Sequence, residues 1–200
     1  MTALRLWLVR HGETAWSLNG QHTGTSDIAL TAHGEAQARA LAPALGAMQF
    51  AHVFTSPARR ARQTCALAGF AGAAAADADL AEWDYGDDEG LRTGEIRAQR
   101  PGWTIRRDGC PGGESPDAVA HRADRAIAAL RELSGDVLLF SHCQFGCSLS
   151  ARWIGLGVIA AQHLQLDTAA IGVLGCNPAH AEIAVIARWN WAPDRAASAP

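Results

Sequence analysis

The stretch Leu6-Trp-Leu-Val-Arg-His-Gly-Glu-Thr14 joins a short apolar run to an abrupt series of polar residues. Four consecutive apolar residues, 6–9, are typical of a strand buried on both faces in a parallel sheet. Arg10 and His11 follow at once, and ligands of open α/β sheets bind beyond the carboxyl ends of the strands. Gly12 leaves room for a close approach. Taken alone, the same residues also fit a surface arginine and a turn histidine.

Two further apolar runs end in a similar way. Val53-Phe54 leads into Ser56-Pro57, which fits a helix N-cap and a first helical residue, and arginines follow in the helix predicted over 57–68. Residues 137–140 form the third run, which ends at His142. An enzyme that holds a phosphate has reason to gather cations and imidazoles at one sheet edge. The residues expected to meet there are Arg10, His11, Arg60 and His142.

The composition narrows the chemistry. The 200 residues predict one domain with a large core, and 48% hydrophobic residues is normal for a globular protein. A net charge of −3 gives no sign of a nucleic-acid surface. All 17 basic residues are arginines, which excludes a Walker A lysine and a Schiff-base lysine. Phosphate binding must therefore come from arginine, histidine or backbone N–H groups.

The cysteines and the N-terminus bear on the compartment. Five cysteines without a framework spacing favour free thiols in a reducing compartment. Cys143-x-x-x-Cys147 is not a common zinc spacing. The apolar run before Arg10 is too short for a signal peptide or a membrane span. We therefore expect a cytoplasmic protein without a membrane or nucleic-acid partner.

Periodicity and turn residues predict the remaining elements. Residues 15–30 are interpreted as an active-site loop, and the alanine run 71–78 as a short edge strand. Ser115 fits the N-cap of a long helix. Helices are expected over 32–45, 57–68, 93–99, 115–133 and 144–156, and the final strands over 171–174 and 183–187.

Four motifs in order carry a family resemblance. Arg10-His11-Gly12-Glu13-Thr14 resembles the signature of the histidine phosphatase superfamily, also called phosphoglycerate mutase-like. The three supporting motifs are Ser56-Pro57-x-x-Arg60-Ala61-x-x-Thr64, Leu80-Ala-Glu-Trp-Asp-Tyr-Gly86 and Ser141-His142. A narrower branch contains bacterial acid phosphatases and sedoheptulose-bisphosphatase-like enzymes. Resemblance to that branch comes from Gly20-Gln-His-Thr-Gly24, Glu82-Trp-Asp-Tyr-Gly86 and Gly109-Cys-Pro-Gly-Gly-Glu-Ser115.

The resemblance implies an α/β fold. Its form is a three-layer α/β/α sandwich with a mostly parallel central sheet, in one domain over residues 1–191. A segment near 84–115 is expected to cover the site like a lid. The tail 192–200 is expected to be disordered.

The resemblance also implies roles for the site residues. His11 is the nucleophile that becomes phosphohistidine, and Arg10, Arg60 and His142 bind the non-transferring phosphate oxygens. Glu82 protonates the leaving alcohol and then activates water. Two guanidiniums and an imidazolium supply the positive charge, so no metal ion and no cofactor is implied.

Other residues carry weaker indications. The resemblance places Thr23 and Gly24 at the substrate phosphate, although a Thr-Gly pair fits a plain connecting loop equally well. Trp83 beside Glu82 disfavours the charged form of a carboxyl group, which suits a proton donor. Glu89 is the rival carboxylate and is interpreted as structural.

Four further arginines have two interpretations each. Arg59 and Arg62 compete with Arg60 for the phosphate, but a solvated helix face is favoured for them. Arg106 and Arg107 fit either rim contacts for a second anionic group or a solvated surface.

One motif departs from the family pattern. Relatives of the branch commonly read His-Gly-His-Phe where this chain has His142-Cys143-Gln144-Phe145. Gln144 is a candidate substrate contact that cannot become a cation, which weakens the expected affinity for a second anionic group. Cys143 is either a reactive thiol beside the phosphate or a small core hydrophobe.

Three functions are compatible with these residues. The favoured one is a phosphomonoesterase acting on a small phosphorylated metabolite, such as a sugar phosphate. A phosphoglycerate mutase uses the same residues, but the chain lacks the extra segment that such mutases carry. A catalytically inactive phospho-ligand-binding protein is the third, and the intact set of residues argues against it. The substrate and the oligomeric state stay open.

Overall fold

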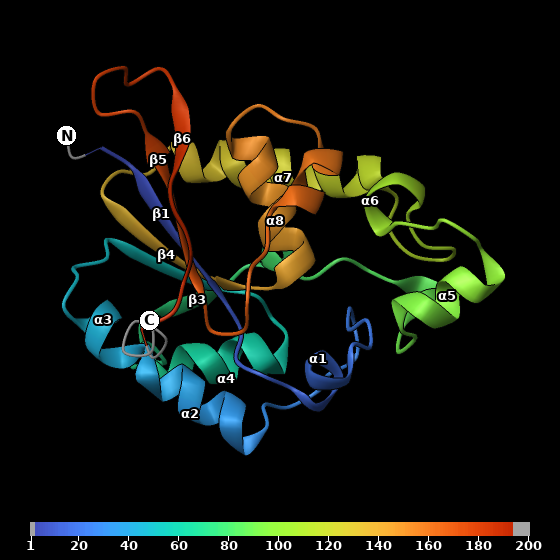
Figure 1. Ribbon diagram of the computed structural model, residues 1–200. Coiled ribbons are helices and arrows are strands. Elements are labelled where there is room, and N and C mark those ends of the chain that lie inside the picture. Colours follow the sequence, from blue (N-terminus) through green and yellow to red (C-terminus); the bar gives the residue numbers. More distant parts are fainter. Residues whose placement is uncertain (1–2, 194–200) are drawn as a thin grey trace, which may run out of the picture.

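A six-stranded sheet forms the centre of the computed structural model, which describes residues 3–193 (Figure 1). The strands are β1 (Arg5–Arg10), β2 (His52–Thr55), β3 (Ala74–Ala76), β4 (Asp136–Ser141), β5 (Ile171–Cys176) and β6 (Ala184–Trp191). Their order is β3-β2-β4-β1-β5-β6. Neighbours from β3 to β1 pair in parallel, whereas β5 is antiparallel to both β1 and β6. The mostly parallel sheet expected from the sequence is confirmed.

Helices cover both faces of the sheet. They are α1 (Ala15–Asn19), α2 (Ala32–Ala40), α3 (Ala42–Gly46), α4 (Arg59–Leu67), α5 (Thr93–Gln99), α6 (Ile105–Asp108), α7 (Pro116–Arg131) and α8 (Cys143–Trp153), with 3-10 helices at Ala78–Leu80, Gly86–Asp88 and Val158–His163. Residues of α3 and α4 pack on one face, and α7 and α8 pack on the other. This is the expected three-layer α/β/α sandwich.

Strand β4 explains why the sheet is buried on both sides. Val137 and Leu139 belong to the core under α7 and α8, and Leu138 and Phe140 belong to the core under α3 and α4. All four side chains are fully buried. A strand in this position is therefore apolar at every residue, which is the continuous pattern seen in the sequence.

The register of the parallel strands places their ends side by side. Arg10 pairs with Ser141 across β1 and β4, and Thr55 pairs with Phe140 across β2 and β4. The backbone N–H of His11 then donates to the carbonyl oxygen of Ser141 at 3.0 Å. The residues that follow the three strands consequently lie at one edge of the sheet.

Three local expectations are wrong. The helix predicted over 32–45 is divided at Leu41 into α2 and α3, because Pro43 has no backbone N–H with which to continue α2. The helix after β2 begins at Arg59, with Ala58 as its N-cap. The loop 15–30 contains α1, whose N-terminus carries a capping box between Thr14 and Ser17.

The segment 84–115 carries α5 and α6 at one side of the molecule (Figure 1). Its two ends are joined, because the N–H of Glu114 donates to the carbonyl oxygen of Asp84 at 2.9 Å. At the C-terminus, Ala192 is 7% exposed, so the tail expected from residue 192 still packs there. Residues 194–200 of that tail lie outside the described residues. In the described part of the chain, no helix has the length and apolar character needed to cross a membrane.

Candidate active site

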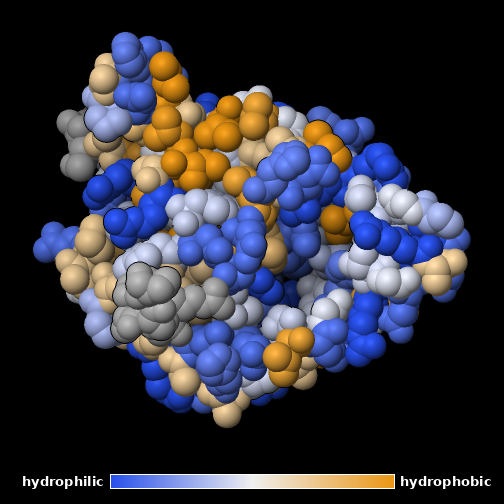
Figure 2. Space-filling model, in the orientation of Figure 1, coloured by the Kyte–Doolittle hydropathy of each residue, from blue (hydrophilic) through white to orange (hydrophobic). Residues whose placement is uncertain are grey.

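A cavity of about 190 Å³ lies at the carboxyl ends of β1 and β4. Its walls come from the end of β1, the segment around α1, the residues after the Ala78–Leu80 helix and the start of α8. Figure 2 shows a hollow with hydrophilic walls on this side of the molecule. The lining residues are Arg10, His11, Ser17, Gly20, Gln21, His22, Thr23, Glu82, Tyr85, Cys143 and Gln144.

The imidazole of His11 is held in one tautomer. Its Nδ1 lies 2.7 Å from the carbonyl oxygen of Gly12, and a carbonyl oxygen only accepts, so Nδ1 carries the proton. Nε2 is then the nitrogen with a free lone pair. Gly12 is fixed in turn by its N–H, which donates to Thr64 Oγ1 at 3.0 Å. A Cβ atom at Gly12 would lie 2.4 Å from the carbonyl oxygen of Gly34, so this position requires glycine.

The guanidinium of Arg60 is fully buried beside this cavity rather than in its wall. Its Nη atoms donate to the carbonyl oxygens of Thr23, Gly24 and Ser26 at 2.9–3.0 Å. Its Nε donates to Nδ1 of His142 at 3.2 Å. Arg60 therefore fixes the loop that carries Thr23 and also sets the tautomer of His142.

His142 is a neutral imidazole, so the expected imidazolium is wrong. Because Nδ1 accepts from Arg60, the proton sits on Nε2, which donates to Ser56 Oγ at 2.7 Å. Burial holds the pKa of His142 well below its usual value, and the charge of Arg60 lowers it further. The ring lies 5.2 Å from that of His11, centroid to centroid, and like Arg60 it does not line the cavity.

His11 is also neutral. Burial lowers the pKa of its imidazole well below the usual value, and the positive charges of Arg10 and Arg60 act in the same direction. Arg10 itself lines the cavity, where its Nη1 donates to the carbonyl oxygen of Leu166 at 2.7 Å. Its Nε is buried without a hydrogen-bond partner. A donor in that state is available to a ligand.

The carboxylate of Glu82 is held at the N-terminus of α8. Oε1 accepts from the backbone N–H groups of Trp83 and Phe145 at 2.9 and 2.7 Å, and Oε2 accepts from that of Gln144 at 3.0 Å. Two of these donors belong to the first turn of α8, which has no other side-chain cap. Glu82 thus caps the helix and faces the cavity at once.

Arg122 on α7 supports the backbone around Glu82. It donates to both carboxylate oxygens of Glu114 at 2.9 and 2.7 Å. It also donates to the carbonyl oxygens of Ala81 and Glu82 at 2.7 and 3.3 Å. The expected neighbour Trp83 is fully buried and does not line the cavity, so it acts as an anchor of this segment.

The weaker candidate residues differ in whether they line the cavity. Thr23 and Gln144 line the cavity. Gly24 does not, and its N–H donates to the carboxylate of Glu89 at 2.9 Å. Glu89 also accepts from the N–H of Ser26 at 3.0 Å, so it holds the loop in place, as interpreted from the sequence.

Some lining residues have no assigned role in the sequence analysis. His22 is the most prominent, since it stacks on Tyr85 with ring centroids 4.7 Å apart. Burial lowers the pKa of His22. Ser17 was missed because α1 was interpreted as loop. The Gly20–Gly24 motif was the available signal for His22. Across residues 3–193, no cluster of three or more histidine, cysteine or acidic side chains is arranged to hold a metal ion.

Comparison with known proteins identifies the family. A family model described as the histidine phosphatase superfamily (branch 1) matches residues 6–191. This chain belongs to the histidine phosphatase superfamily. The shared region includes all the elements that form the cavity, from β1 to α8.

Individual relatives of the superfamily cover most of the chain. An acid phosphatase of Mycobacterium tuberculosis is 41% identical over 186 residues, which are 91% of this chain and 91% of the relative. The sedoheptulose 1,7-bisphosphatase of Saccharomyces cerevisiae is 36% identical over 187 residues, which cover 77% of this chain and 69% of the relative. The solved structure of an open reading frame product of Mycobacterium tuberculosis has a TM-score of 0.89 at 39% identity. The match covers 94% of this chain and 98% of that structure.

The neutral histidines of this histidine phosphatase predict a pH-dependent stability. In the unfolded chain, histidines take up protons as the pH falls through about 6.5, whereas buried His11 and His142 stay neutral. The free energy of unfolding should therefore fall below pH 6.5, by up to about 1.4 kcal/mol per pH unit for each. Urea unfolding at several pH values between 5 and 8 measures this free energy. The slope of the free energy of unfolding against pH should be smaller for His142→Gln than for His121→Gln, which changes an exposed histidine. Equal slopes in the two variants would contradict the assignment of His142 as a neutral buried imidazole.

Cys143 is the cysteine predicted to react at this site. It lines the cavity, and the neighbouring Cys147 side chain lowers the pKa of its thiol, opposed by burial and helped by the charge of Arg10. Burial raises the pKa of Cys65 and of Cys110 to about 12. Iodoacetamide should therefore inactivate the protein through Cys143, and inorganic phosphate should slow the inactivation. The measurement is the residual activity against time, with the modified residue identified by mass spectrometry.

Two variants control this experiment. Cys143→Gly, which has the family-like residue, should lose activity more slowly than wild type when each is compared with its untreated sample. Cys147→Ala should still be inactivated, because Cys143 remains in the cavity wall. Equal rates for wild type and Cys143→Gly would assign the sensitive thiol elsewhere, with exposed Cys176 as the next candidate.

Proposed function

We propose that this chain is a phosphomonoesterase that acts on a small phosphorylated metabolite, such as a sugar phosphate, through a phosphohistidine intermediate. The observation that carries the proposal is a neutral imidazole with a free Nε2 in a cavity that also contains a guanidinium and a carboxylate. These groups belong to His11, Arg10 and Glu82. The phosphatase names of the acid phosphatase and bisphosphatase relatives support the same reaction class.

In the first half of the reaction, Nε2 of His11 attacks phosphorus in line with the bond to the leaving alcohol. The N–P bond forms as the P–O bond breaks, and protonated Glu82 gives its proton to the departing oxygen. Arg10 is the cation in the cavity wall, and its unpartnered Nε is a donor for a phosphate oxygen. Arg60 and His142 lie beside the cavity, and burial together with the charges of Arg10 and Arg60 keeps the nucleophile neutral.

In the second half, the carboxylate of Glu82 takes a proton from water, and the resulting hydroxide attacks the phosphohistidine. Inorganic phosphate leaves, and His11 and protonated Glu82 are regenerated. This sequence uses no metal ion and no organic cofactor. A mutase would instead return the phosphoryl group to a bound acid, so water access decides between the two reactions.

His11→Ala tests the nucleophile. Wild type should release phosphate from sugar phosphates and form an acid-labile phosphoenzyme, whereas His11→Ala should do neither, because no other neutral ring nitrogen occupies that place. Quench-flow labelling with a radioactive ester measures both. His22→Gln, which removes another imidazole of the cavity, should still become labelled. Exchange between 2- and 3-phosphoglycerate without phosphate release would favour a mutase, and binding without either reaction an inactive protein.

Glu82→Gln tests the general acid. An alkoxide leaves poorly without a proton, so the variant should lose about 10²-fold or more of kcat on a sugar phosphate. It should lose much less on p-nitrophenyl phosphate, because nitrophenolate leaves without a proton. Activity on that ester also shows that the variant is folded. Glu89→Gln, outside the cavity, should affect both esters equally; equal losses in Glu82→Gln would remove Glu82 from the role.

A further inference from the structure

A second cavity, of about 280 Å³, adjoins the one that contains His11. The two cavities share His22 and Gln144 as lining residues. The far wall of the second cavity comes from the segment 84–115, through residues of α5, α6 and the turn between them, including Trp103. The second cavity therefore lies next to the one in which the phosphate of an ester would meet His11.

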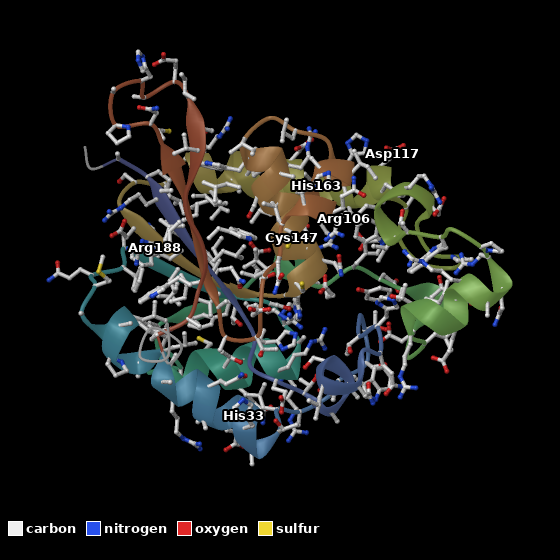
Figure 3. All side chains as sticks on the ribbon, viewed as in Figure 1. His33, Arg106, Asp117, Cys147, His163 and Arg188 are labelled. Carbon is white, nitrogen blue, oxygen red and sulfur yellow. The ribbon has the colours of Figure 1, made fainter. Side chains whose placement is uncertain are left out.

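Arg106 is the notable cation of this second cavity. Its Nε is buried without a hydrogen-bond partner, and among the described residues no carboxylate forms an ion pair with it. It is close enough to α8 for its charge to lower the pKa of Cys143, and Figure 3 shows it near Cys147 on that helix. An unpaired buried donor costs free energy, so such a position is better explained by a ligand than by packing.

The neighbouring Arg107, in the same helix, has the hydrogen-bond partners that Arg106 lacks. Arg107 is exposed and donates to both carboxylate oxygens of Asp108 at 2.9 Å and to the carbonyl oxygen of Gly102 at 2.6 Å. It does not line the second cavity. Within residues 3–193, Arg107 forms an ion pair and Arg106 does not.

The wall shared by the cavities adds an unpaired acceptor. Oε1 of Gln144 is buried without a hydrogen-bond partner. The other lining groups of the second cavity are neutral or positive, with Arg97 as the second cation and no aspartate or glutamate among them. Such a wall suits an anionic group, with a hydroxyl between that group and the phosphate to satisfy Gln144.

We propose that the second cavity binds a second anionic group, a carboxylate or a phosphate, on the alcohol part of the ester, with Arg106 as its cation. This deepens the proposed function and rests on it: the phosphate at His11 is the reacting group, and the second oxyanion selects the substrate. The positive charge that Gln144 does not provide in the sequence motif is supplied here from α6. Arg106 is therefore a specificity-determining residue that contacts the substrate away from the reacting bond.

The test compares related esters with and without a second anionic group. One series is glucose 6-phosphate, 6-phosphogluconate and glucose 1,6-bisphosphate; the shorter pair is glycerol 3-phosphate and 3-phosphoglycerate. Wild type should have a higher kcat/KM on at least one charged ester than on its uncharged counterpart. Arg106→Met should lower that ratio about tenfold or more, because a charge-assisted hydrogen bond is lost. Arg106→Lys should retain part of it, and Arg107→Met should leave it as in wild type.

The outcomes separate the two proposals. A preference for 6-phosphogluconate identifies a carboxylate ligand, and one for the bisphosphate identifies a phosphate. If wild type shows no preference for charged esters, or Arg106→Met lowers all esters by the same factor, the second-anion site is wrong while the phosphatase stands. If no ester, including p-nitrophenyl phosphate, is hydrolysed, the proposed function is wrong. Calorimetric dissociation constants for the same esters then still show whether Arg106 selects the charged ones.

Discussion

The guanidinium of Arg60 is fully buried, and a buried charge destabilises a fold unless hydrogen bonds replace the water that it loses. Three backbone carbonyl groups of the loop 23–26 and the imidazole of His142 provide that replacement. The loop is therefore held against α4, and the tautomer of His142 is fixed. The positive charge in turn lowers the pKa of His11. One constraint thus holds the loop, fixes the tautomer of the second histidine and adds to the burial and the Arg10 charge that keep the candidate nucleophile neutral.

Glu82 both stabilises the first turn of α8 and lines the cavity. Glu82 accepts hydrogen bonds from the first turn of α8, so the helix would leave two N–H groups unpaired without it. The same carboxylate lines the cavity. Arg122 and Glu114 fix its backbone from the opposite side. The candidate proton donor is therefore held in a fixed position, as general acid–base catalysis requires.

The segment 84–115 forms the far wall of the second cavity. Its ends meet at Asp84 and Glu114, and its apolar residues Ile96, Trp103 and Ile105 join the core under α7 and α8. It is consequently part of the packed body and not a loose flap over the cavity. Arg106 extends from it towards α8, where the polar wall begins. The segment 84–115 therefore forms one wall of the second cavity, whereas the end of β1 forms a wall of the cavity that contains His11.

The sequence by itself predicted a mostly parallel sheet and the candidate site residues at one of its edges. Apolar runs that end in Arg10-His11 and Ser141-His142 predict parallel strands and a shared edge, because both patterns are local to the chain. Charge states and unpaired groups were decided only by the tertiary structure. His142 was expected as an imidazolium, yet burial and the charge of Arg60, 82 residues away in sequence, keep it neutral. Arg106 and Arg107 are equivalent in sequence, but the folded turn pairs Arg107 with Asp108, whereas no carboxylate of the described residues pairs with Arg106. Burial and hydrogen-bond partners depend on residues that meet only in the folded chain, and no spacing along the sequence encodes them.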